Sequence, residues 1–136
     1  MAMEFDLVAS GTRVTANGEG EPVDVSGSAS RTFLVKMQID EVIEQESLDL
    51  AIWGSADGQA WGQMPLLKLP QRFYRGETRM VLDLTVKPEA KFIRARWVLN
   101  RWGRVAPIPM FVFGVHAAEV AASKPLTPRA VAQAQS

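Results

Sequence analysis

Very few residues set the nucleophilic and metal chemistry that this chain could carry. His116 is the only histidine, and the chain contains no cysteine. Common zinc sites need several Cys or His ligands, and a catalytic triad needs a histidine beside an activated serine. The sequence has no G-x-S-x-G elbow, phosphate-binding glycine loop or dinucleotide fingerprint, which usually accompany such chemistry. We interpret His116 as a surface or structural residue and expect no metal, no cofactor and no enzymatic activity.

Paired carboxylates are the one catalytic arrangement that remains open, because any two acids across a cleft could serve glycoside hydrolysis. The acids that cluster are Asp40, Glu41, Glu44 and Glu46. Their segment is predicted to be a polar loop or a single helical turn. A solvated acidic surface explains such a cluster more simply than catalysis does, so we expect these side chains to be exposed.

The segment Ser55–Trp61, with the sequence SADGQAW, combines a turn with an aromatic anchor. Asp57 and Gly58 favour an Asx-turn, in which Asp57 bonds to nearby backbone and Gly58 takes a positive φ. Trp61 is expected to return to the core after this turn. Asp57 and loop carbonyls could instead ligate Ca²⁺, although one carboxylate is few for such a site and the EF-hand pattern is absent.

Aromatic and basic residues interleave between Arg72 and Arg104. Such interleaving can stack bases or sugars. The simpler interpretation places Phe92 and Trp97 in the core and pairs the arginines with acids of the first half or of a neighbour. Trp102 lies in a segment that contains Pro and Gly and is the aromatic most favoured to be exposed. The candidate ligand or interface surface comprises Tyr74, Arg94, Arg96, Trp102 and Arg104.

The net charge of zero conceals two opposed halves. Residues 1–67 carry three Lys/Arg against eleven Asp/Glu, whereas residues 68–104 carry ten Lys/Arg against three acids. This division favours self-association between unlike surfaces, or a basic patch over residues 68–104 that binds a polyanion. Alternatively, the two halves interleave in the fold and their charges mix.

Alternating segments must position these residues, and they predict an all-β fold. The predicted strands cover residues 5–9, 32–40, 48–52, 66–69, 78–86, 92–100 and 110–118, with a further short strand at Val23 and Val25. We expect the chain to turn at Ser10-Gly11 and the segment 66–69, bounded by prolines, to lie at an edge. Seven or eight short strands without an amphipathic helix predict an antiparallel β-sandwich, plausibly a jelly roll.

The sequence predicts one domain over residues 1–119, loop-rich at 10–31. The tail at 120–136 is rich in Ala and Pro and is expected to be mobile or to order on assembly. No apolar run approaches the roughly 20 residues that span a bilayer. The N-terminus lacks the basic and apolar regions of a secretory signal. We expect no membrane span and a cytoplasmic location at synthesis, or incorporation into a released particle.

The SADGQAW element resembles the S-x-D-G-x-x-W element of discoidin-type (coagulation factor 5/8 C-like) β-sandwiches. It also resembles an element of small phage-type virion and tail structural proteins. The phage-type resemblance extends over residues 20–100, through a Gly/Ser-rich opening, the Val23-x-Val25 strand and an "R-x-x-W" strand downstream. Discoidin domains usually carry a disulfide, which this chain cannot form. The resemblance implies a sandwich fold and a non-catalytic role.

These observations favour a non-enzymatic structural protein, a subunit that forms or decorates a homomeric assembly such as a virion, tail or filament. The first alternative is a module that binds carbohydrate or another ligand, with Trp102, Tyr74, Trp61 and nearby arginines as its platform. The second alternative is a polyanion-binding protein that uses the basic segment 68–104.

Overall fold

The computed structural model describes residues 3–42, 46–101 and 110–121. It contains nine strands and one turn of 3-10 helix in this part of the chain. The elements are β1 (Glu4–Val14), β2 (Gly18–Glu19), β3 (Val23–Asp24), β4 (Thr32–Val42), β5 (Glu46–Ser55), β6 (Leu67–Lys68), β7 (Gly76–Asp83), η1 (Leu84–Val86), β8 (Phe92–Arg101) and β9 (Phe111–Glu119).

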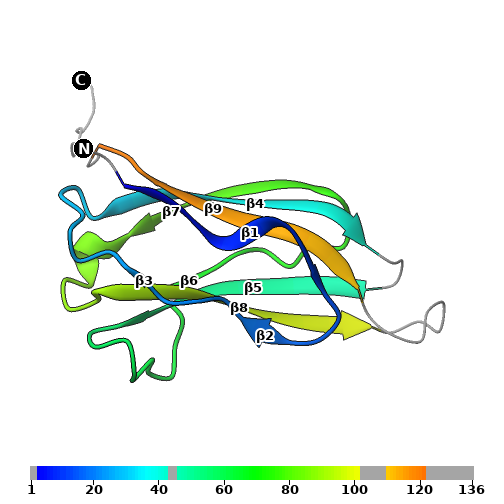
Figure 1. Cartoon of the computed structure of the whole chain (residues 1–136), viewed down its shortest axis with the longest axis horizontal. Helices are drawn as coiled ribbons and strands as arrows, with labels where there is room; N and C mark the ends of the chain where they lie inside the picture. Colours follow the sequence, from blue (N-terminus) through cyan, green and yellow to red (C-terminus); the bar gives the residue numbers. More distant parts are fainter. Residues whose placement is uncertain (1–2, 43–45, 102–109, 122–136) are drawn as a thin grey trace.

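The strands form two sheets packed face to face (Figure 1). Sheet A has the order β1-β9-β4-β7, and sheet B has the order β2-β8-β5-β6, with β3 also paired to β8. Every pairing between these strands is antiparallel. The predicted antiparallel β-sandwich is therefore confirmed.

The pairing follows one long hairpin that is rolled across both sheets. β5 pairs with β6 at its centre, followed outward by β4 with β7, β2 and β3 with β8, and β1 with β9. The pairs β4–β9 and β5–β8 then join the rolled layers within each sheet. This is a jelly-roll arrangement, and residues 56–66 form the turn at its centre. The count exceeds the predicted eight because β2 and β3 are separate two-residue pieces along β8.

The core lies between the inward faces that the period-two pattern predicts. On β4, Phe33 and Val35 are fully buried, as are Phe111 and Phe113 on β9. The ring of Phe113 meets Trp97 of the opposite sheet edge-to-face, with the ring centroids 5.6 Å apart. This contact joins the two sheets, because aromatic pairs in this geometry contribute beyond their buried area.

The prediction that the chain turns at Ser10-Gly11 is wrong, since β1 continues to Val14. The pairing of β1 with β9 shifts register between Asp6 and Val8 and again between Val8 and Thr12. Gly11 has a φ of +78°, the conformation in which glycine accommodates an extra residue in a strand. The turn signal in the sequence therefore marks a bulge, which bends β1 without ending it.

The expectation that the acidic cluster is a solvated loop is wrong for Glu46. This residue begins β5 and is 1% exposed, because it shares inward parity with Leu48 and Leu50. Its Oε1 accepts a hydrogen bond of 2.7 Å from the backbone N–H of Met110. Asp40 is exposed, as predicted, and Glu44 lies outside the described residues.

Candidate functional site

The SADGQAW turn is held by a small set of hydrogen bonds. The Oγ of Ser55 accepts from the N–H of Gly58 at 2.9 Å, and Oδ1 of Asp57 accepts from the N–H groups of Gln59 and Ala60 at 2.8 and 3.0 Å. Gly58 has a φ of +79°. This is the Asx-turn geometry that the sequence predicts. Trp61 is buried, 9% exposed, but it lies against Arg94 on the outer face of sheet B and not in the core cluster between the sheets, where it was expected.

The charge of Asp57 is stabilised by the turn itself. Hydrogen bonds from Ala60 and Gln59, and then from Ser55, hold the pKa of Asp57 below its ordinary value. Within the described ranges, no three His, Asp or Glu side chains converge as a metal site would require. Asp57 therefore has a local structural task in this loop. Calcium binding by Asp57, the alternative that the sequence left open, stays untested.

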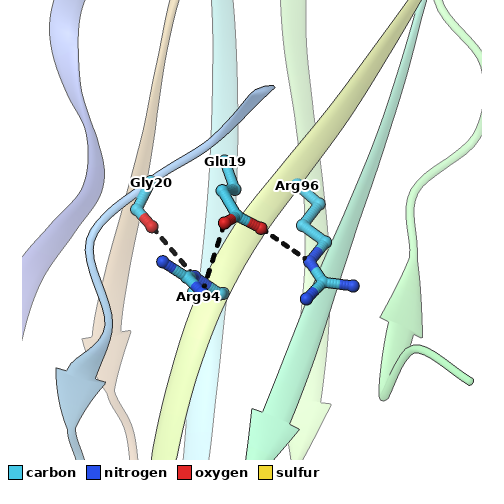
Figure 2. A network of polar contacts seen from close by, with 4 residues as sticks. All are labelled: Glu19, Gly20, Arg94 and Arg96. Carbon is cyan, nitrogen blue, oxygen red and sulfur yellow. Dashed lines mark hydrogen bonds and ion pairs between the residues drawn. The ribbon is translucent and has the colours of Figure 1, made fainter. Parts of the chain in front are cut away.

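Arg94 and Arg96 share one carboxylate on the outer face of sheet B. Strand alternation on β8 turns Ile93 and Ala95 inward and both arginines outward. Arg96 Nε donates to Glu19 Oε1 at 3.0 Å, and Arg94 Nη1 lies 3.4 Å from Glu19 Oε2 (Figure 2).

A backbone acceptor and two aromatic rings complete the environment of the arginines. Arg94 Nε donates to the carbonyl oxygen of Gly20 at 3.1 Å (Figure 2). The guanidinium carbon of Arg94 lies 4.9 Å from the ring centroid of Trp61, and that of Arg96 lies 4.5 Å from the centroid of Trp53. Such cation–π contacts orient a guanidinium as well as stabilise it. Both cations are therefore paired within the chain, which leaves them poorly placed to bind an added polyanion.

Two side chains of this arrangement were not among the predicted site residues. Trp53 lies on β5 opposite Arg94 of β8. It follows the inward residue Ile52, so strand alternation in the sequence could have placed it on the same outer face as the arginines. Glu19 belongs to β2, which is two residues long. So short a strand leaves no periodicity in the sequence, so no local signal pointed to Glu19.

The predicted ligand surface is not brought together as one site. Tyr74 precedes β7, and the neighbouring Arg72 bridges to Leu48 at the start of β5. Arg94, by contrast, pairs with Trp53 near the end of β5. Tyr74 and the arginine network therefore lie toward opposite ends of sheet B. Two other members of the predicted surface, Trp102 and Arg104, lie outside the described residues.

Tyr74 marks a second candidate surface. Its side chain is 79% exposed, and its ring centroid lies 6.3 Å from that of Phe73. A surface hollow of about 460 Å³ is lined by Ile39 and residues 71–78. Arg72 Nε donates to Thr78 Oγ1 at 2.8 Å and so fixes one wall.

His116 lies on the outer face of sheet A between two carboxylates. Its Nδ1 is 2.8 Å from Asp6 Oδ1, and its Nε2 is 2.8 Å from Glu4 Oε2. The hydrogen bond to Asp6, followed by that to Glu4, raises the pKa of His116. Both ring nitrogens are engaged, so neither is placed to take a proton from a nucleophile. This geometry fits the structural interpretation of His116.

Comparison with known proteins adds no identification. No protein-family model matches the chain, and a search of curated proteins finds no match. The resemblance of SADGQAW to discoidin-like and phage-type sandwiches accordingly stays a prediction. No helix with the length and hydrophobicity of a membrane span is found among the residues that the structure describes.

Proposed function

We propose that this protein is a non-enzymatic structural subunit that forms or decorates a homomeric assembly. The observation that carries the proposal is the open margin of sheet A at β7. β7 is eight residues long and pairs on one side only, with β4. An unpaired strand edge presents backbone N–H and C=O groups that another chain can complete.

The other sheet margins among the described residues are blunted. β1 is interrupted by two register shifts. β6 has two residues, with Pro65 and Pro70 nearby, and β2 and β3 are equally short. Short strands, bulges and prolines are the usual protections of sheet edges. β7 has none of these three features, because it is eight residues long, contains no proline and keeps a continuous register with β4 from Gly76 to Asp83. It does carry charged residues, which also protect edges, at Glu77, Arg79 and Asp83.

The opposed charges of the two halves no longer support assembly, because the rolled hairpin places early strands beside late ones. Glu19 of the acidic half is paired with Arg94 and Arg96 of the basic half. The same contacts weaken the polyanion-binding alternative, which needed those arginines. The assembly proposal therefore depends on the open edge.

Light scattering on the purified chain, with negative-stain imaging of the same sample, tests this proposal. A defined oligomer or polymer whose mass increases with protein concentration is the expected result. A particle of one chain's mass at every concentration reached would contradict it. Thermal melting of the same sample verifies that a monomer is folded.

Ligand binding at the Tyr74 hollow is the second candidate function. An exposed aromatic ring beside a hollow that both polar and apolar residues line can bind the face of a small ligand such as a sugar ring. The test is a glycan array with the wild-type chain and Tyr74→Ala, with Val86→Ala as a matched change at another exposed position. Binding that only Tyr74→Ala abolishes supports this function, and absence of binding to every sugar contradicts it.

A further inference from the structure

We infer that two copies of the chain pair through β7, antiparallel and in a two-fold register centred on Val81, so that sheet A continues across both copies. This inference rests on the proposed function, since it specifies the interface of a homomeric assembly. The strand that pairs with the open edge of β7 is β7 of a second copy of the chain. Figure 1 shows β7 at the margin of its sheet, beyond β4.

The direction of the backbone groups on β7 restricts how a partner can pair. Leu84 donates its N–H to the carbonyl of Arg31 at 2.7 Å, which continues the register of Thr32 opposite Asp83. In an antiparallel ladder, alternate residues direct both backbone groups toward the same neighbour. Even-numbered residues of β7 therefore bond to β4. The odd-numbered residues Glu77, Arg79, Val81 and Asp83 direct their groups outward.

Charge then distinguishes the registers in which two β7 strands overlap well. Centring on Arg79 places that arginine opposite its own copy, and centring on Met80 places Glu77 opposite Asp83. Like charges directly opposite one another destabilise a strand pair. Centring on Val81 instead places Arg79 opposite Asp83 twice, with the two valines between them. The register centred on Thr78 also brings opposite charges together, Glu77 with Arg79, over an equal overlap, but it leaves the exposed Val81 outside the paired residues of β7.

The side chains of β7 fit this register on both faces. Val81 is 56% exposed in the single chain and would be covered by its own copy. Met80, which is partly buried, would lie opposite the core residue Leu82 and extend the interior across the interface. Arg79 contacts Glu77 of its own strand in an exposed ion pair, and such pairs are weak enough to rearrange.

Single-cysteine variants measure the register directly, because the chain has no cysteine of its own. Residues in a hydrogen-bonded antiparallel pair have Cα atoms about 5.5 Å apart, within the span of a disulfide, about 4.4–6.8 Å. We expect Val81→Cys to form a covalent dimer on oxidation or with a short thiol cross-linker. Arg79→Cys and Met80→Cys are matched controls that cross-link to themselves only in the competing registers.

Charge reversal provides an independent test. Arg79→Asp and Asp83→Lys each place like charges opposite one another twice, so each should raise the dimer Kd on the order of tenfold. In a mixture of the two variants, the mixed dimer again has opposite charges at both of these contacts and should recover wild-type association. Arg13→Asp, an exposed reversal on β1, is the control.

The outcomes separate this interface from the assembly proposal. An oligomeric wild type in which Val81→Cys does not cross-link, or in which Arg79→Asp associates normally, overturns the Val81-centred pairing of β7 and leaves homomeric assembly standing. A monomeric wild type contradicts both. Asp83 also accepts a hydrogen bond from the N–H of Thr85. Should Asp83→Lys fail to fold, the cysteine series, with its exposed central position, still decides the matter.

Discussion

Glu119 connects three parts of the chain through one carboxylate. Its Oε1 accepts from the N–H of Met3 at 2.8 Å, and its Oε2 accepts from the N–H of Ser30 at 2.9 Å and from the hydroxyl of Ser28 at 2.8 Å. The hydrogen bond from Ser30, followed by that from Met3, lowers the pKa of Glu119 from 4.5 to about 2. The folded state therefore favours the ionised carboxylate.

The lowered pKa predicts a loss of stability in acid. The contribution of Glu119 should be complete above its unfolded pKa of 4.5 and should disappear as the pH falls toward about 2, because the unfolded chain then binds the proton more readily. Urea midpoints of the wild type and Glu119→Gln across this range provide the measurement. The difference between the urea midpoints of the wild type and Glu119→Gln should narrow as the pH falls. A difference in midpoint that does not change with pH would show that Glu119 stabilises the fold through its shape and not through its charge.

Gly58 is the residue on which the SADGQAW turn depends. Its φ of +79° is unfavourable for residues with a side chain, and an added Cβ would lie 3.6 Å from the Phe92 ring. We expect Gly58→Val to lower the free energy of unfolding by about 1–3 kcal/mol. Gly27→Ala, in open space without a positive φ, is the control for thermal melting. Equal melting temperatures for Gly58→Val and the wild type would reject this role.

Single residues were predictable where their partners lie nearby in sequence. The Asx-turn follows from Ser55, Asp57 and Gly58 alone, because each bond spans two or three residues. The partner of Arg94 and Arg96 is Glu19, more than seventy residues away. Only the rolled topology brings them together, so the sequence suggested that these arginines pair with acids of the first half but could not identify Glu19 as the partner.

At the scale of elements, the β1 bulge depends on a glycine of the neighbouring strand. A Cβ at Gly114 would lie 2.7 Å from the Cα of Ser10, so the bulge crosses β9 where no side chain projects. We expect Gly114→Ala to destabilise the fold by about 1–3 kcal/mol, because backbone must move to relieve the clash. Ala118→Ser, also on β9, is the matched control. Denaturant melts that do not distinguish Gly114→Ala from this control would contradict the packing argument.

The elements that the sequence predicted well are those with uninterrupted alternation. β4, β8 and β9, which are 11, 10 and 9 residues long, each place four apolar residues at period two. β1 was shortened in the prediction because its bulge breaks that period. Glu46 was assigned to a loop by its charge, although its parity with Leu48 and Leu50 continued β5. At the ends of strands, the alternation of inward and outward positions therefore predicts burial better than the charge of a residue does.

At the scale of the whole molecule, the rolled hairpin mixes in space the charges that the sequence keeps in separate halves. Each outer pair joins an early strand to a late one, as β1 with β9 and β2 with β8. An acidic first half and a basic second half therefore meet along these seams, as Glu19 does with Arg96. The separation of acidic and basic residues along the sequence therefore favours pairing of these strands within one chain. It leaves the open edge of β7 as the argument for assembly.

The same topology brings the two ends of the described chain together and predicts where it can be shortened. Glu119 donates its N–H to Met3 at 2.7 Å, and Val120 donates to Thr32 at 2.9 Å. The domain predicted over residues 1–119 therefore needs its last residue. A chain ending at Ala118 should melt several degrees lower than one ending at Ala121. Equal melting of the two truncated chains would show that Glu119 does not close the sandwich.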